Sequence, residues 1–315
     1  MKRKGWRIGL YSVAVLLTVG FALLGLGITI NNLPRAPASE SELRNGLDKA
    51  INWLTANRTR IEGEDNAVLW WMLASANADL GGDTRLTALL ADYRSQPHNA
   101  LTAQPWRMLF DGPSAAPYEL AGRALGFPGY NLFILYGLSC DPNLERLQVV
   151  QDELATNYCP SAWVLPPHCA THQLMGLLWS LRNECADASP AVALAIARSI
   201  RRQLVFDFRV DDAYVQRALL LAVSGDWTTT LRPVWISRIL NAQLADGGWD
   251  GAALLVRTTG SKYIVSERSF VSIRDPVSSF HTTVQAAWLL AHILIQRKES
   301  TTGLTTWYRL QGEGH

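Results

Sequence analysis

Three side chains capable of acid–base chemistry each lie at the start of an apolar segment. His172 lies in CATHQLMGLLWSL, Asp212 in DDAYVQRALLLAVSG and His281 in HTTVQAAWLLA. Imidazole and carboxylate groups can take up and release protons during a reaction, and imidazole also binds metals. If the fold brings these residues to one cavity, we expect them to serve as acid, base or ligand.

Each of these residues also has a structural explanation. An aspartate at a helix start caps free N–H groups and interacts favourably with the helix dipole. A buried histidine is more often hydrogen-bonded within the protein than catalytic. Tyr214 and Gln216, which follow the aspartate, and the indoles of Trp249 and Trp288 are the candidate substrate-binding residues. Packing in the core is the alternative for the tryptophans.

The elements that must position these side chains are helices. From Ser41 onward, apolar residues recur at helical spacing, and no alternating pattern predicts a sheet. The helices pair with a period of about 30–50 residues, which is typical of a toroid or solenoid. We therefore expect an all-α domain of ten or more helices over residues 41–298, followed by a tail at 299–315.

Two short segments carry a resemblance to known families. Gln243, Gly247 and Trp249 fit Gln-x-x-x-Gly-x-Trp, a repeat that resembles that of terpenoid cyclases of the squalene and hopene type. Phe280-His281-Thr282 resembles a helix start in protein prenyltransferase β subunits, where the histidine binds zinc. Both families are α/α toroids, in which paired inner and outer helices alternate around a central cavity. The resemblance implies this fold over residues 39–296, with the amino ends of the inner helices around one mouth of the cavity.

The catalytic motifs of these two families are not matched. Asp207, Asp211 and Asp212 lack the spacing of the Asp-x-Asp-Asp with which such cyclases protonate an alkene. No cysteine lies between Gly251 and Phe280, where prenyltransferases place a zinc ligand. No phosphate-binding glycine loop, Gly-x-Ser-x-Gly turn or His-Glu-x-x-His sequence is present. No cofactor is expected, and zinc at the histidine that follows Phe280 is the alternative.

The four cysteines lie within one part of the chain, at Cys140, Cys159, Cys169 and Cys185. An even number in a domain outside the cytoplasm indicates disulfides. The first and last cysteines end two helices that should run parallel, so these ends lie on the same side. The middle two join the end of the intervening antiparallel helix to the start of the next. We therefore predict the pairs Cys140–Cys185 and Cys159–Cys169.

Zinc is the alternative use of two of these cysteines. Cys159, His168, Cys169 and His172 are of the right types, but their spacing matches no closed zinc module, and an oxidising compartment favours the disulfides. No metal site is predicted here.

The amino terminus predicts a membrane anchor. A basic tail at residues 1–7 precedes residues 8–30, which carry no charged side chain. Twenty-three helical residues span about 35 Å, enough to cross a bilayer. The basic tail predicts a cytoplasmic amino terminus and a domain on the other side, joined by a tether at 31–40. The alternative is a signal peptide cleaved at the small residues Ala36-Pro37-Ala38.

The net charge of the chain excludes one class of partner. The net charge of +2 derives from the basic tail, and the rest of the chain carries about −2, so no nucleic-acid surface is expected. We expect a single-pass protein of the inner or plasma membrane, with a periplasmic or extracellular toroid that binds or processes a glycan, lipid or peptide. The alternatives are a non-catalytic binding or scaffold domain and a subunit of a membrane or envelope assembly. The sequence leaves open whether the protein is an enzyme.

Overall fold

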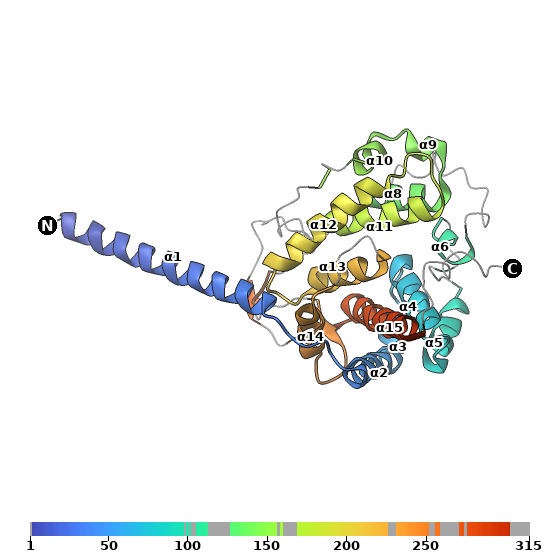
Figure 1. Ribbon diagram of the computed structural model, residues 1–315, viewed down its shortest axis with the longest axis horizontal. Coiled ribbons are helices and arrows are strands. Elements are labelled where there is room, and N and C mark those ends of the chain that lie inside the picture. The colour runs from blue at the N-terminus through green and yellow to red at the C-terminus, as the bar shows by residue number, and fades with distance from the viewer. Residues whose placement is uncertain are drawn as a thin grey trace.

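The structure, a computed structural model, is mostly helical (Figure 1). It describes residues 2–97, 99, 101, 105–112, 127–155, 158–159, 169–225, 231–251, 256–258, 271–273 and 276–302. The first half contains α1 (Lys2–Asn32), α2 (Glu40–Ala56), α3 (Arg58–Ile61), α4 (Ala67–Asp79), α5 (Thr84–Arg94), α6 (Met108–Asp111), α8 (Gly129–Ser139), α9 (Pro142–Glu145) and α10 (Gln148–Glu153). The second half contains α11 (Cys169–Arg182), α12 (Pro190–Phe206), α13 (Asp212–Val223), α14 (Pro233–Asn241) and α15 (Phe280–Thr302).

Two short strand pairs interrupt this helical pattern between α14 and α15. Strand β1 (Trp249–Asp250) pairs antiparallel with β4 (Ser278–Ser279), and β2 (Val256–Thr258) pairs antiparallel with β3 (Val271–Ile273). The expectation of a helical architecture is confirmed, and the expectation of no strands is wrong in this connection. A local reason is Gly248, because a Cβ there would lie 2.5 Å from the side chain of Ser278. The missing side chain lets the chain return close to the start of β1.

Five helices, α8, α11, α13, α15 and α4, run parallel, with their amino-terminal turns at one end of the domain. Contacts near these amino ends join neighbouring helices: Tyr130 stacks on His172, Thr171 Oγ1 donates to Gln216 Oε1 at 2.7 Å, Thr282 Oγ1 donates to Asp212 Oδ1 at 3.1 Å, and Trp70 contacts Phe280. Toward the other end, α4 meets α15 and α8 meets α11. The chain returns between these helices through others, including α5 and α12.

Tryptophans from three of these helices contact one another. The ring of Trp71 on α4 contacts Trp179 on α11 at a centroid distance of 4.9 Å and Trp288 on α15 at 5.0 Å. Aromatic pairs of this kind bury a large area and add a specific edge-to-face attraction. Helices that are distant in sequence are thereby held together.

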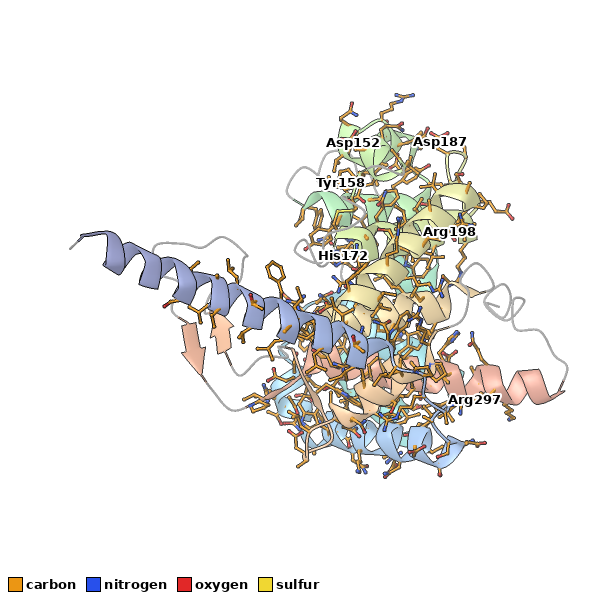
Figure 2. The ribbon with its side chains drawn as sticks, turned by 60° about the vertical axis from the view of Figure 1, so that its left-hand side comes forward. Asp152, Tyr158, His172, Asp187, Arg198 and Arg297 are labelled. Atoms are coloured by element: carbon orange, nitrogen blue, oxygen red, sulfur yellow. A yellow bond between two sulfur atoms is a disulfide. The ribbon has the colours of Figure 1, made fainter. Side chains whose placement is uncertain are left out.

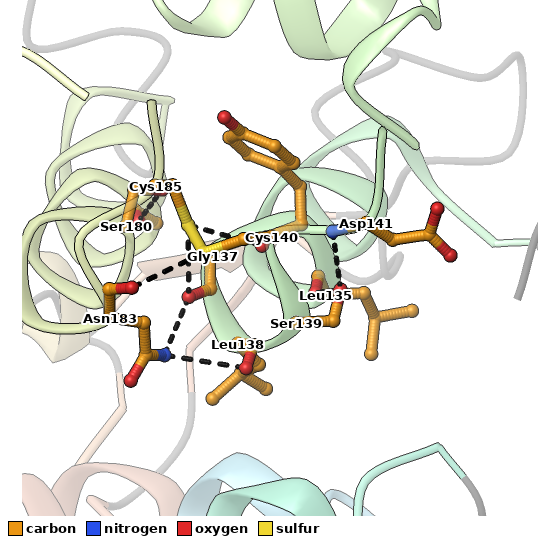
Figure 3. The surroundings of a disulfide bond; sticks show 11 residues. Leu135, Gly137, Leu138, Ser139, Cys140, Asp141, Ser180, Asn183 and Cys185 are labelled. Carbon is orange, nitrogen blue, oxygen red and sulfur yellow. Dashed lines mark hydrogen bonds between the residues drawn. A yellow bond between two sulfur atoms is a disulfide. The ribbon is translucent and has the colours of Figure 1, made fainter. Parts of the chain in front are cut away.

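Both disulfides join the predicted pairs. Cys140 and Cys185 connect the carboxyl ends of α8 and α11, with Cα atoms 5.2 Å apart (Figure 3). Beside this bond, Asn183 Nδ2 donates to the carbonyl of Gly137 at 2.8 Å. Cys159 and Cys169 pair at the start of α11. The zinc alternative is therefore wrong, because both of its sulfur ligands are in a disulfide; its His168 lies outside the described residues.

Helix α1 projects from the domain beside the end of α12 (Figure 1). Within the described residues, one helix, Ser12–Asn32, is long and apolar enough to cross a membrane, and none of its most apolar window is buried in the protein. A core helix of a soluble protein passes the same length test but is mostly buried. The length, composition and exposure of α1 are compatible with a membrane span or a signal sequence.

The start of the predicted tether at residues 31–40 is packed onto the domain, whereas residues 33–37 are exposed. Asn31 is fully buried; its Nδ2 donates to the carbonyl of Leu204 at 2.6 Å, and its Oδ1 accepts from the hydroxyl of Tyr214 at 2.9 Å. Asn32 Nδ2 donates to the carbonyl of Val205 at 2.7 Å. The last carbonyls of a helix have no partner within it, so these asparagines satisfy free acceptors of α12. The end of α1 is thereby fixed to α12 and α13.

Candidate functional site

A small open pocket lies where α13 and α15 begin. Its volume is about 240 Å³, and it is lined by Asp211, Asp212, Ala213, Gly251, Ser279, His281 and Thr282. Asp212 Oδ1 lies 3.5 Å from His281 Nδ1. Two of the three predicted acid–base residues are therefore neighbours, although they come from separate helices. We call this the Asp212–His281 pocket.

Backbone contacts fix the position of Asp212. Its N–H donates to the carbonyl of Gly251 at 3.3 Å, which ties the start of α13 to the residue after β1. Its carboxylate accepts from Thr282 Oγ1, in the first turn of α15. The carboxylate is mostly buried, with 15% of the side chain exposed, whereas 41% of the His281 side chain is exposed. A held carboxylate beside an accessible imidazole can orient that imidazole for proton transfer.

Asp211 is a second titratable group in this pocket. Burial, reinforced by the charge of Asp207, raises the pKa of Asp211 to about 6, while Arg209 opposes the shift. Its carboxylate also caps α13 by accepting from the N–H of Tyr214 at 3.0 Å. From the sequence, capping explained this residue. Its pKa near neutral makes it a third acid–base candidate, and the adjacent pair of aspartates was the available signal.

His172 lies at the same end of the five helices, in the first turn of α11 (Figure 2). Its ring stacks on that of Tyr130 from α8, with centroids 4.6 Å apart and planes inclined by 15°. Among the described residues, His172 does not line the Asp212–His281 pocket. The structure therefore brings together two of the three predicted catalytic residues and places the third against a neighbouring helix.

The four predicted substrate-binding residues all lie in the interior with protein partners. The hydroxyl of Tyr214 donates to Asn31, and Gln216 accepts from Thr171. The indole N–H of Trp249 donates to the carbonyl of Ile239 at 2.7 Å, and that of Trp288 donates to Asp79 Oδ2 at 3.1 Å. None is more than 7% exposed. These contacts give each residue a structural role, and contact with a ligand stays a prediction.

The residues of the cyclase-like repeat connect helices. Gln243 Nε2 donates to the carbonyls of Gly46 and Gly247, both at 2.8 Å, which links the end of α14 to α2. Gly247 has a φ of 97°, and a Cβ there would lie 2.4 Å from the carbonyl oxygen of Lys49. A side chain at this position would therefore be strained and would also clash with α2. The repeat explains packing at this corner of the domain.

A second carboxylate–imidazole pair lies toward the other end of the domain. Asp79 Oδ2, on α4, lies 3.1 Å from His292 Nδ1, on α15, and also accepts from the indole of Trp288. His292 Nε2 lies 2.9 Å from the side-chain nitrogen of Gln296. Both imidazole nitrogens thus have partners, which favours a structural role. Trp288 and His292 are four residues apart on one helix face, but nothing in the sequence indicates Asp79.

Glu153 is a buried carboxyl group that sequence reasoning missed. It ends α10 and is 2% exposed. Its Oε2 has no hydrogen-bond partner among the described residues. Burial raises the pKa of Glu153 to about 7, and a hydrogen bond from Tyr158 only partly opposes the shift. The folded protein therefore favours the protonated form of this carboxyl.

This shift predicts a pH-dependent stability. The folded state keeps a proton that the unfolded chain releases above its ordinary pKa of 4.5, so the free energy of unfolding should fall as pH rises from 4.5 to about 7. Glu153→Gln should stabilise the protein by up to about 3 kcal/mol above pH 7 and leave it unchanged near pH 4. Urea unfolding at several pH values measures this. Equal effects of the substitution at all pH values would contradict the assignment.

Within the described ranges, no group of three or more histidine, cysteine, aspartate or glutamate side chains is placed to hold a metal ion. Among the described residues, a zinc ion at His281 would therefore have Asp212 as its one neighbouring ligand candidate. Comparison of the chain with protein-family models, curated proteins and solved structures found no match.

Proposed function

We propose that the protein is a single-pass membrane protein with an α/α-toroid domain on the oxidising side, whose Asp212–His281 pocket binds a ligand at the membrane surface and acts on it by acid–base chemistry. The observation that carries this proposal is the meeting of the Asp212 carboxylate and the accessible His281 imidazole in an open pocket. The non-catalytic alternative is a binding domain that uses the same pocket.

Three features support the membrane placement. Helix α1 has an exposed apolar surface of bilayer length. The two disulfides fit an oxidising compartment, and the basic tail favours a cytoplasmic amino terminus. Cleavage near Ala38 would remove Asn31, and the carbonyl of Leu204 and the hydroxyl of Tyr214 would each lose a buried partner. This cost favours an uncleaved anchor over a signal peptide.

The helix arrangement supports the toroid. Parallel helices α8, α11, α13, α15 and α4 contact one another in that order, as inner helices of a toroid would, and α5 and α12 return the chain between them. The resemblance to terpenoid cyclases and protein prenyltransferases agrees with this arrangement. Their reactions are not proposed here, because Asp207 is held by arginines and the zinc-ligand cysteine is absent from the sequence.

The position of the pocket favours a lipid or lipid-linked ligand over a soluble glycan or peptide. Tyr214, in the first turn of α13, bonds to Asn31 at the end of the membrane helix. The amino ends of α13 and α15, where the pocket opens, therefore lie at the end of the domain nearest the bilayer. A ligand whose headgroup reaches out of a membrane would meet Asp212 and His281 first.

His281→Ala tests the proposal, with His292→Ala as the matched control. His281 is exposed, so its removal should change stability by less than about 0.5 kcal/mol but abolish function. His292 is more buried than His281, and His292→Ala leaves the half-buried Asp79 with one partner fewer, so it should cost about 1 kcal/mol. Thermal unfolding of the detergent-extracted full chain gives stability. Complementation of a deletion strain gives function, and mass spectrometry of co-purified organic material gives ligand retention.

The outcomes separate the hypotheses. Loss of complementation with ligand retained indicates catalysis, and loss of both indicates a binding role for His281. Asp212→Asn keeps the acceptor for Thr282 but removes the charge, so it should reduce function in the same direction. If His281→Ala keeps both complementation and ligand, the pocket is not the functional site.

A further inference from the structure

We infer that a second pocket binds the phosphate headgroup of an anionic membrane lipid at the junction of α1 with the domain. This inference rests on the proposed function only in taking α1 to span the membrane. The pocket has a volume of about 500 Å³ and lies among the end of α1, the α12–α13 connection and α14. We call it the anchor pocket.

The walls of the anchor pocket are mainly apolar and continue the surface of the membrane helix. Ile30, Leu33, Val210 and Val234 contribute to them. Ile30, in the last turn of α1, is 45% exposed, and Leu33, the residue after α1, is 50% exposed. Acyl chains can therefore lie along α1 while the headgroup enters the pocket at the level where the hydrocarbon region ends.

Two arginines supply the charge. Arg238 Nη2 donates to the carbonyl of Phe208, and the Arg238 side chain also interacts with the Tyr214 hydroxyl. Arg238 Nε is buried with no hydrogen-bond partner among the described residues. No carboxylate of the described residues lies within ion-pair distance of Arg238. Arg35 is exposed in the pocket wall. The Glu42 carboxylate accepts from Ser39, and the charge of Arg35 helps to lower the pKa of Glu42.

Two nearby acids have other partners. Asp207 is bound by Arg209 and Arg217, and Asp211 accepts from the backbone of Tyr214. Guanidinium groups bind phosphate oxygens through paired, charge-assisted hydrogen bonds. An apolar wall continuous with a membrane helix, together with two arginines, matches an anionic lipid better than a soluble anion. A soluble anion would not use the apolar surface.

Native mass spectrometry of the full chain in neutral detergent tests the inference. Phosphatidylglycerol and phosphatidylcholine with the same acyl chains are titrated separately, and inorganic phosphate is added as a competitor. We expect one retained phosphatidylglycerol, bound at least about tenfold more tightly than phosphatidylcholine and not displaced by phosphate. Arg35→Gln and Arg238→Gln should each weaken it about tenfold, the effect of losing one charge-assisted hydrogen bond.

Matched variants keep the result interpretable. Arg198→Gln removes the same charge from an exposed position on α12 and should leave binding unchanged (Figure 2). Arg35 is exposed, so its substitution should not affect folding, and Arg238→Lys retains a charge if Arg238→Gln is unstable. Equal binding of the two lipids, displacement by inorganic phosphate, or unchanged binding in Arg35→Gln overturns the inference.

Failure of this inference is distinguishable from failure of the Asp212–His281 pocket. His281→Ala should keep wild-type affinity for phosphatidylglycerol, because His281 does not line the anchor pocket as described. Loss of lipid binding in that variant would place the lipid elsewhere and overturn the inference. Conversely, Arg35→Gln leaves the Asp212–His281 contact intact, so lipid binding can fail while complementation depends on His281.

Discussion

Replacing Arg217 by methionine should lower the free energy of unfolding by about 3–5 kcal/mol, the range for breaking a buried ion pair. Arg217 is fully buried, and its Nη1 lies 2.6 Å from Asp207 Oδ2, a side chain that is 1% exposed. Its Nε also donates to Gln203 Oε1 at 3.0 Å. Methionine fills much of the space but leaves the Asp207 carboxylate short of one charge partner in the interior. Denaturant unfolding of the full chain measures the loss.

A second arginine provides the control for this prediction. Arg209 also binds Asp207, at 2.8 Å, but its side chain is 29% exposed, so Arg209→Gln should cost much less. Combining Arg217→Met with Asp207→Asn should recover part of the loss, since the uncompensated charge is then removed. A cost below 1 kcal/mol for Arg217→Met would show that the pair is not a main support of the α12–α13 corner.

Removal of the Cys140–Cys185 disulfide should destabilise the protein by about 4 kcal/mol, and removal of Cys159–Cys169 by about 3 kcal/mol, in the chain-entropy treatment of cross-links. The difference follows from the separations of 45 and 10 residues that the two bonds close. A Cys140→Ser/Cys185→Ser variant and the corresponding Cys159→Ser/Cys169→Ser variant are unfolded by denaturant with and without reductant. Reductant should affect each variant less than the wild-type protein.

The order of the two effects is the informative result. If the shorter loop gave the larger loss, the entropy of the unfolded chain would not be the main source of stability. The contacts of Asn183 with the carbonyls of Gly137 and Leu138 would remain when the longer cross-link is removed. They hold the ends of α8 and α11 together but do not restrict the unfolded chain.

Features that depend on helix order were predictable from the sequence. The disulfide pairs followed from which end of each helix carries a cysteine. The meeting of Asp212 with His281 followed from placing both at the starts of helices whose amino ends converge, although His172, placed in the same way, does not line their pocket. In each case the direction of a helix, which is readable from periodicity and capping, determines which residues are neighbours.

Features that depend on single side-chain contacts between distant helices were not predictable. Asn31 reads as the start of a polar tether, yet it is fully buried because α12 ends beside it. Asp79 lies before a glycine turn and resembles any residue at a helix end, but it meets His292 on α15. Arg217, within an apolar helix, gives no sign in the sequence of its contact with Asp207. Such partners are set by packing, which local patterns do not contain.

The attachment of Asn31 and Asn32 has a consequence for how the domain moves. With a flexible ten-residue linker, the domain could move to about 15–20 Å from the end of α1 and tilt in any direction. If α1 is the membrane anchor proposed above, a domain bonded to it at Leu204, Val205 and Tyr214 instead follows each change in the tilt or rotation of α1. Changes in bilayer thickness that alter the helix tilt would therefore raise or lower the Asp212–His281 pocket relative to the lipid headgroups.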